Sequence, residues 1–164
     1  MKKKIGIVAL FGLLTTCNIV HAEEYYIPDS VPYDIGVECW AAHRTMVIQD
    51  LVDCHEDLAN WYKEKGDYKN LYNEIGNVGY YYSIGGDYKK AIKYTLEALE
   101  GFKKIGDKHG EADSYRQFGY IYKQKGDKKK AKEYYMKAYE LYKSIGAESD
   151  AQDTLKAMTD KRRY

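Results

Sequence analysis

Five glycines recur at a spacing of twenty residues along most of this 164-residue chain. They are Gly66, Gly86, Gly106, Gly126 and Gly146, and each of the first four is followed directly by an aspartate. Glycine readily adopts the left-handed conformation found just past a helix end, and aspartate is a preferred helix N-cap. The intervening segments contain no proline and are rich in lysine, glutamate, alanine, leucine and tyrosine. The spacing therefore predicts consecutive helices of about 16 residues joined by short Gly-Asp turns.

The sequence itself repeats every forty residues, which is the length of two such helices. Residues 67–106 and 107–146 are identical at more than a third of their aligned positions. A unit made of one helix pair buries its apolar face by stacking on the next unit. The repeat therefore predicts an all-α solenoid.

Two motifs recur in register within this repeat. Residues 78–82 and 118–122 both have the form apolar-Gly-x-x-Tyr, and a later Gly-Asp turn in each repeat is followed by Lys or Tyr residues and then alanine. In this combination the chain resembles the tetratricopeptide repeat family, in a variant longer than the usual period of about 34 residues. The resemblance implies a right-handed α–α solenoid that binds proteins. It also implies an interhelix seam, formed here by Gly79, Gly119, Ala91 and Ala131.

The forty-residue register extends beyond the two clear repeats of residues 67–146. Upstream, we expect residues 34–66 to form a degenerate first helix pair, although no turn-forming residue marks its centre, and one continuous helix is the alternative. Downstream, residues 147–164 are expected to form a capping helix followed by a basic C-terminus. Residues 23–33 contain both prolines of the chain and are expected to form an extended arm.

The first 22 residues have the pattern of a secretory signal peptide. Lysines at positions 2–4 precede an apolar run over residues 5–14, which is too short to cross a bilayer. Ala22 completes a sequence typical of a cleavage site. The pattern therefore predicts export to the periplasm or the medium, without a transmembrane segment in the mature chain. Lipid attachment at Cys17 is the alternative.

Cys39 and Cys54 are equally distant from the expected turn of the first helix pair. In an antiparallel hairpin they would face each other, and an oxidising compartment favours a disulfide closing a loop of about 15 residues. In one continuous helix they would lie about 22 Å apart, which excludes a bridge. His43 and Asp50 flank the turn, so a four-ligand metal site with the two cysteines is a weaker alternative that lacks any known zinc signature. We predict no metal and no cofactor.

No pattern typical of catalysis is present. The chain lacks a Gly-x-Ser-x-Gly elbow, a phosphate-binding glycine loop and a His-Glu-x-x-His pair, so we do not expect an enzyme. The formal net charge of +1 argues against a generally basic nucleic-acid-binding protein. A redox or metal protein centred on the two cysteines is the weakest remaining interpretation.

The resemblance also implies where a partner binds, because in this family the first helix of each pair lines the concave face. The position after each seam residue is aromatic, and basic residues share the same helix face. The candidate binding residues are Trp40, Tyr80, Tyr120, Arg44, Arg116 and Lys123. We expect them to form an aromatic-lined groove for a peptide or protein of unknown identity. The alternatives are packing of these rings between helices, self-association, and an obligate structural or assembly subunit of a cell-envelope or secreted complex.

Overall fold

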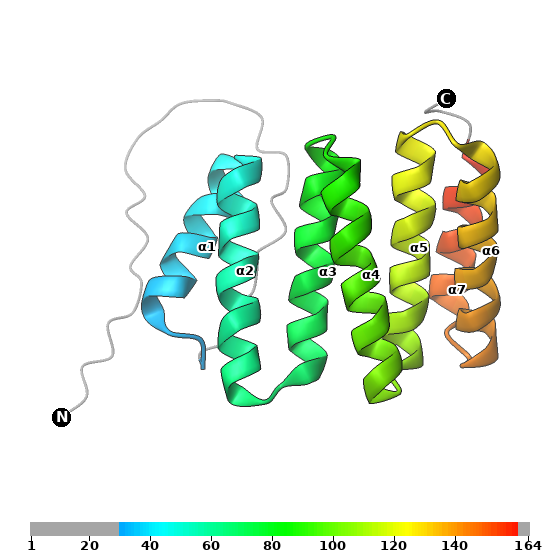
Figure 1. Ribbon diagram of the computed structural model, residues 1–164. Coiled ribbons are helices and arrows are strands. Elements are labelled where there is room, and N and C mark those ends of the chain that lie inside the picture. Colours follow the sequence, from blue (N-terminus) through cyan, green and yellow to red (C-terminus); the bar gives the residue numbers. More distant parts are fainter. Residues whose placement is uncertain (1–29, 161–164) are drawn as a thin grey trace, which may run out of the picture.

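The computed structural model describes residues 30–160, and every regular element in this part of the chain is a helix (Figure 1). The helices are α1 (Tyr33–Thr45), α2 (Ile48–Lys65), α3 (Tyr68–Ile84), α4 (Tyr88–Ile105), α5 (Lys108–Gln124), α6 (Lys128–Ser144) and α7 (Glu148–Thr159). The all-α solenoid predicted from the repeat is confirmed. The predicted signal peptide, Cys17 and the last four residues lie outside the described residues.

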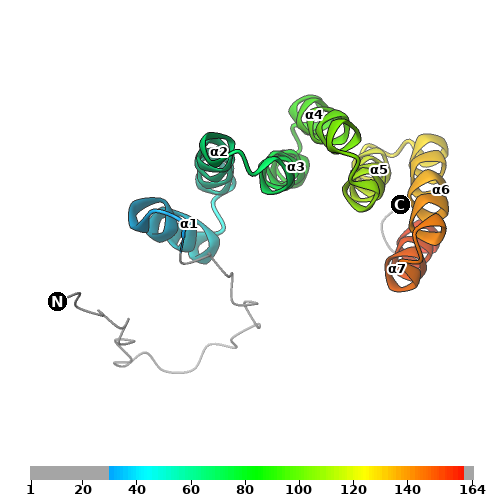
Figure 2. The same ribbon diagram turned by 90° about the horizontal axis from the view of Figure 1, so that it is seen from below.

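Neighbouring helices run antiparallel and together form a curved solenoid with an inner and an outer row of helices (Figure 2). Each helix packs on the next helix along the chain, and α3 also contacts α5. Seen along the helix axes, α2, α4 and α6 lie on the outer side of the arc, while α1, α3, α5 and α7 lie on the inner side (Figure 2). None of the described helices has the length and apolar character needed to span a membrane.

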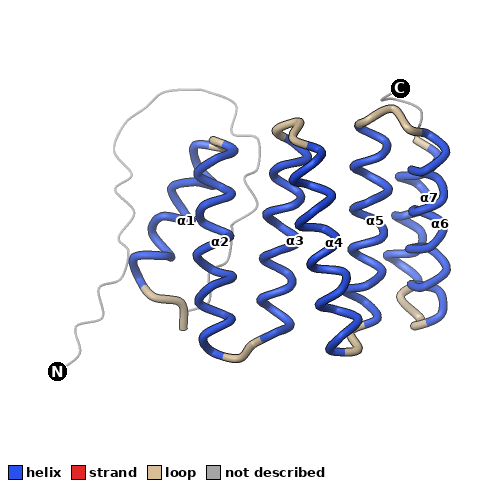
Figure 3. The backbone as a smooth tube through the Cα atoms, in the orientation of Figure 1, coloured by secondary structure: helices blue, strands red, loops and turns tan. Residues whose placement is uncertain are grey.

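Short turns connect the helices (Figure 3), and most follow the Gly-Asp pattern. The five periodic glycines all have φ angles between 72° and 81°, in the left-handed region. The carboxylate of each following aspartate accepts a hydrogen bond from the backbone N–H three residues later, which caps the next helix. The four capping residues are Asp67, Asp87, Asp107 and Asp127.

The turn between α1 and α2 is made by a residue that carries no turn signal. Met46 has a φ angle of 54°, and among the described residues it is the single non-glycine residue with a positive φ. Its backbone N–H donates to the carbonyl of Ala42 and ends α1. Residues 34–66 therefore form a helix pair, and the alternative of one continuous helix is wrong.

The two seam glycines lie at close contacts between the helices of each repeat. A methyl group added at Gly79 would lie 2.9 Å from Thr95 Oγ1 and 3.2 Å from the carbonyl oxygen of Ala91. The equivalent group at Gly119 would lie 2.7 Å from the Tyr135 ring. Ala91 and Ala131 are buried. Small residues at these positions therefore allow α3 to pack on α4 and α5 on α6.

Candidate functional site

A groove of about 680 Å³ lies on the concave face, mainly between α3 and α5. Both of these helices lie on the inner side of the arc in Figure 2. The groove is lined by Tyr72, Asn73, Glu74, Gly76, Asn77, Tyr80, Phe102, Asp113, Ser114, Arg116, Gln117, Tyr120, Tyr135 and Ala157. Aromatic rings, carboxamides and charged groups of both signs therefore share one concave surface.

Two of the predicted aromatic residues meet in this groove. Tyr80 comes from α3 and Tyr120 from the equivalent position of α5, and their ring centroids are 5.9 Å apart. Tyr80 is 42% exposed and Tyr120 is half-buried. The two rings therefore combine mutual packing with a surface that a ligand can contact. They are accordingly both interhelix contacts and groove residues.

The third predicted aromatic residue does not line the groove. Trp40 is 53% exposed on α1, and the guanidinium of Arg44 lies 4.6 Å from its ring centroid. The two side chains are one helical turn apart and form a local cation–π pair. In Figure 1, α1 is inclined relative to the helices that follow, and neither Trp40 nor Arg44 lines the groove. Trp40 and Arg44 therefore belong to a separate surface.

Arg116, one of the candidate binding residues, lines the groove. Its Nη2 lies 3.1 Å from Asp113 Oδ1, one turn earlier on α5, and its side chain is 44% exposed. Beside it, Gln117 donates a hydrogen bond of 2.8 Å to the backbone carbonyl of Gly76 on α3. This bond joins the two walls of the groove.

Lys123 does not flank the groove, which corrects the expectation from its helix face. Its side chain is buried, and Nζ donates to the backbone carbonyls of Ala157 at 2.8 Å and Asp160 at 3.0 Å. The ammonium group thus satisfies carbonyls at the end of α7, where cations are favoured. Lys123 therefore holds α7, the capping helix of the solenoid, against α5.

The carboxamides of the groove were missed by the sequence analysis. Asn73 and Asn77 precede Tyr80 by seven and three residues on α3, and Gln117 has the equivalent place on α5. Positions separated by three, four or seven residues share a helix face. The helix-face spacing that identified Tyr80 and Tyr120 would therefore also have identified these carboxamide residues.

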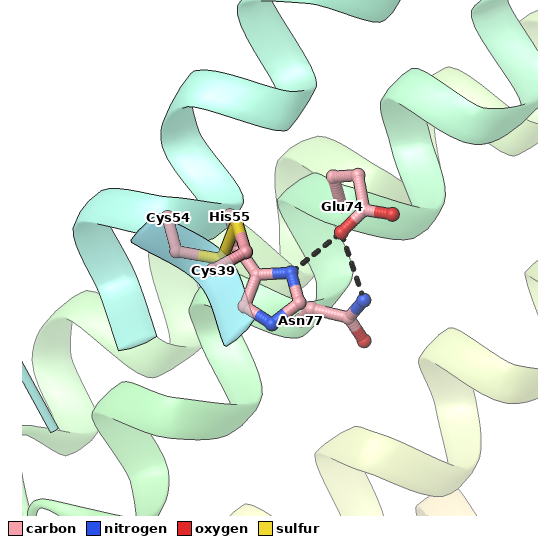
Figure 4. The surroundings of a disulfide bond; sticks show 5 residues. All are labelled: Cys39, Cys54, His55, Glu74 and Asn77. Atoms are coloured by element: carbon pink, nitrogen blue, oxygen red, sulfur yellow. Dashed lines mark hydrogen bonds and ion pairs between the residues drawn. A yellow bond between two sulfur atoms is a disulfide. The ribbon is translucent and has the colours of Figure 1, made fainter. Parts of the chain in front are cut away.

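A buried cluster joins α1 and α2 beside the groove (Figure 4). Cys39 and Cys54 form a disulfide with a Cα–Cα distance of 4.9 Å. His55 extends from α2 toward α3, where its Nδ1 lies 2.6 Å from Glu74 Oε2. Glu74 also accepts a hydrogen bond of 3.1 Å from Asn77. The groove wall and the disulfide region are therefore connected through one carboxylate.

Two further rings complete this cluster. The His43 ring lies 5.4 Å from the His55 ring, and the Tyr81 ring stacks on His55 with a centroid distance of 5.1 Å. Burial and the nearby His55 lower the pKa of His43, which favours its neutral form at neutral pH. Asp50, the fourth ligand of the alternative considered from sequence, is exposed, and His55 takes a place in the cluster instead.

Comparison with known proteins agrees with this architecture. A family model described as "Tetratricopeptide repeat" matches residues 70–144, which extend from the first turn of α3 to the end of α6. No curated protein matches the chain. The matched range and the helix-pair solenoid together support a tetratricopeptide-family repeat in residues 70–144.

Proposed function

We propose that this protein is an exported, non-enzymatic interaction module that binds an extended segment of a partner protein in the concave groove. Tetratricopeptide repeats suggest a protein–protein interaction role. The observation that carries the proposal is the pairing of Tyr80 with Tyr120 in a groove that also contains Arg116. Tyrosine and arginine are enriched among residues that dominate binding energy in protein interfaces.

The chemistry of the groove is suited to an extended peptide. Carboxamides such as those of Asn73 and Gln117 offer both hydrogen-bond donors and acceptors, which match the alternating groups of a peptide backbone. Tyr80 and Tyr120 offer apolar rings with polar hydroxyls at low conformational cost. Arg116 adds a cation suited to an acidic side chain of the partner.

A peptide selection tests this function directly. The immobilised full chain is used to select binders from a random peptide library, and their affinities are measured by calorimetry. We expect Tyr80→Ala combined with Tyr120→Ala to weaken selected peptides about 30-fold or more, equivalent to the loss of one hot spot of about 2 kcal/mol. Tyr33→Ala is the matched control, because this tyrosine is 82% exposed on α1 and lies outside the groove.

The two variants separate the proposal from its alternatives. Equal binding by the double variant and the wild-type chain would place the interaction elsewhere. Loss of binding by Tyr33→Ala alone would point to α1. A wild-type chain that sediments as a dimer, with the double variant monomeric, would instead assign the two tyrosines to self-association.

Export is a separate part of the proposal and has its own test. It rests on the lysines, the apolar run and the cleavage pattern of the first 22 residues. N-terminal sequencing of the chain recovered from outside the cytoplasm of its native host is expected to begin at Glu23. A lipid-modified N-terminus at Cys17 would support anchoring, and an uncleaved chain confined to the cytoplasm would contradict export.

A further inference from the structure

Two cysteines and two histidines lie close together between α1 and α2. Cys39 and His43 lie one turn apart on α1, and Cys54 and His55 are neighbours on α2. Within the described residues, one donor atom each from His43, Cys54 and His55 lie within 4.8 Å of one another. Cys39 Sγ lies 2.07 Å from Cys54 Sγ through the disulfide. The disulfide formed by the two cysteines therefore lies beside the two imidazole rings.

We propose that reduction of the Cys39–Cys54 disulfide converts this cluster into a Zn²⁺ site with two thiolate and two imidazole ligands. A dithiol reductant transfers two electrons and two protons, so that the S–S bond breaks and the reductant becomes a disulfide. Zn²⁺ then binds both sulfurs, and the two thiol protons pass to solvent. The disulfide and the metal site are mutually exclusive states of the same residues.

The donor set matches the requirements of this metal. Zn²⁺ favours tetrahedral coordination by sulfur at about 2.3 Å and nitrogen at about 2.0 Å, which places ligand atoms roughly 3.3–3.8 Å apart. The donor atoms of His43, Cys54 and His55 lie up to 4.8 Å from one another, which differs from that geometry by side-chain adjustments of about 1 Å. Cys39 Sγ becomes available beside them when its bond to Cys54 Sγ is broken. Two thiolates also balance the charge of the cation, so the complex is neutral where Cys39, Cys54 and His55 are buried.

Glu74 supplies the supporting contact typical of a metal-binding histidine. The Nδ1 of His55 lies 2.6 Å from Glu74 Oε2. A proton on Nδ1 that is donated to this carboxylate places the lone pair on Nε2, and this arrangement orients a histidine toward a metal. Asn77 donates to the same oxygen at 3.1 Å and holds the carboxylate in place. Glu74 is therefore a positioning residue for His55.

Cobalt titration tests the site, because tetrahedral Co²⁺ reports its ligands by absorption. The full chain carrying Cys17→Ser is used, so that Cys39 and Cys54 are its only cysteines. After anaerobic reduction with a phosphine and removal of the reductant, we expect one Co²⁺ per chain with thiolate charge-transfer bands and tetrahedral d–d bands. Zn²⁺ should displace the Co²⁺ and remove both signals. The oxidised chain should show no thiolate band. Absence of the stoichiometric bands from the reduced chain would overturn the proposal.

Three variants identify the ligands. His43→Asn with His55→Asn should abolish the tetrahedral bands and weaken Zn²⁺ binding at least 100-fold, although both thiols remain. His109→Asn is the matched control, since His109 is half exposed on α5 outside the cluster, and it should bind as the parent does. Glu74→Gln keeps all four ligands and should weaken binding by about 10- to 100-fold. An unchanged spectrum and affinity in the double histidine variant would refute the site. The cobalt titration of the reduced parent chain remains a test of the site even where a histidine variant fails to fold.

Discussion

At the scale of single residues, the helix ends depend on backbone conformation more than on contacts. Gly66 has a φ of 72°, and apart from its two chain neighbours no residue has an atom within 4 Å of the position that a methyl group would take. Met46 has the same role one helix earlier, at a φ of 54°, with a full side chain. The sequence pattern predicted the turn at Gly66 because glycine and aspartate signal it. At Met46 only the forty-residue register indicated the turn, because methionine is not a turn-forming residue.

These two positions predict opposite effects of substitution. Gly66→Ala is expected to lower the free energy of unfolding by about 1 kcal/mol, because an L-residue is strained in the left-handed region. Met46→Gly is expected to raise it by up to about 1 kcal/mol, since the same strain is removed. Urea denaturation of both variants measures these changes. No change in the Gly66→Ala midpoint would show that this helix end does not depend on left-handed glycine.

A second residue-scale prediction compares two glycines of α3. A methyl group at Gly79 would lie 2.9 Å from Thr95 Oγ1 and 3.1 Å from the Thr95 backbone nitrogen, whereas at Gly76 the nearest atom would be 3.8 Å away. Gly79→Ala is therefore expected to destabilise by about 1–3 kcal/mol through overpacking. Gly76→Ala is expected to stabilise by up to about 1 kcal/mol through helix propensity. A higher unfolding temperature for Gly79→Ala than for Gly76→Ala would contradict close helix packing at Gly79.

At the scale of elements, α1 depends on the disulfide more than the later helices depend on any single bond. Cys39 and Ala42 are its buried residues, whereas α2 buries seven. The equal distances of the two cysteines from the turn predicted the bridge only if two helices formed. That choice was open because residues 34–66 contain no Gly-Asp turn at their centre. The structure resolves it through the backbone of Met46, which no local sequence signal specified.

Loss of the disulfide should therefore loosen one hairpin while the repeats stay folded. With a chelator present, Cys39→Ala and Cys54→Ala together are expected to cost about 3 kcal/mol in the α1–α2 hairpin, the chain-entropy value for a loop of this length. Hydrogen exchange measured by mass spectrometry should accelerate in residues 33–65. Residues 88–144 serve as the internal control and should exchange at an unchanged rate. Equal acceleration in both regions would contradict a local role for the bridge.

At the scale of the whole molecule, the forty-residue repeat predicted the solenoid, but not which aromatic residues share its groove. Tyr80 and Tyr120 meet because α3 contacts α5 across the inner side of the arc. Trp40 has the same place in the repeat, yet it does not line the groove, and α1 is inclined relative to the later helices (Figure 1). Helix inclination arises from side-chain packing of the whole pair, so a repeat position alone cannot specify it.

Lys123 shows how the end of the solenoid is closed, and it provides the last prediction. Lys123→Met keeps the apolar stem of the side chain but removes the two hydrogen bonds to the carbonyls of Ala157 and Asp160. The free energy of unfolding should fall by about 1–3 kcal/mol, because two part-buried carbonyl acceptors lose a charged donor. Since each repeat contacts mainly its neighbours, hydrogen exchange should accelerate in α7 and the adjoining part of α6 while α1–α3 remain unchanged.

Lys129→Met, at an exposed lysine of α6, is the control and should leave both measurements as they are. Acceleration that extends equally to α1 would show that the chain unfolds as one cooperative unit.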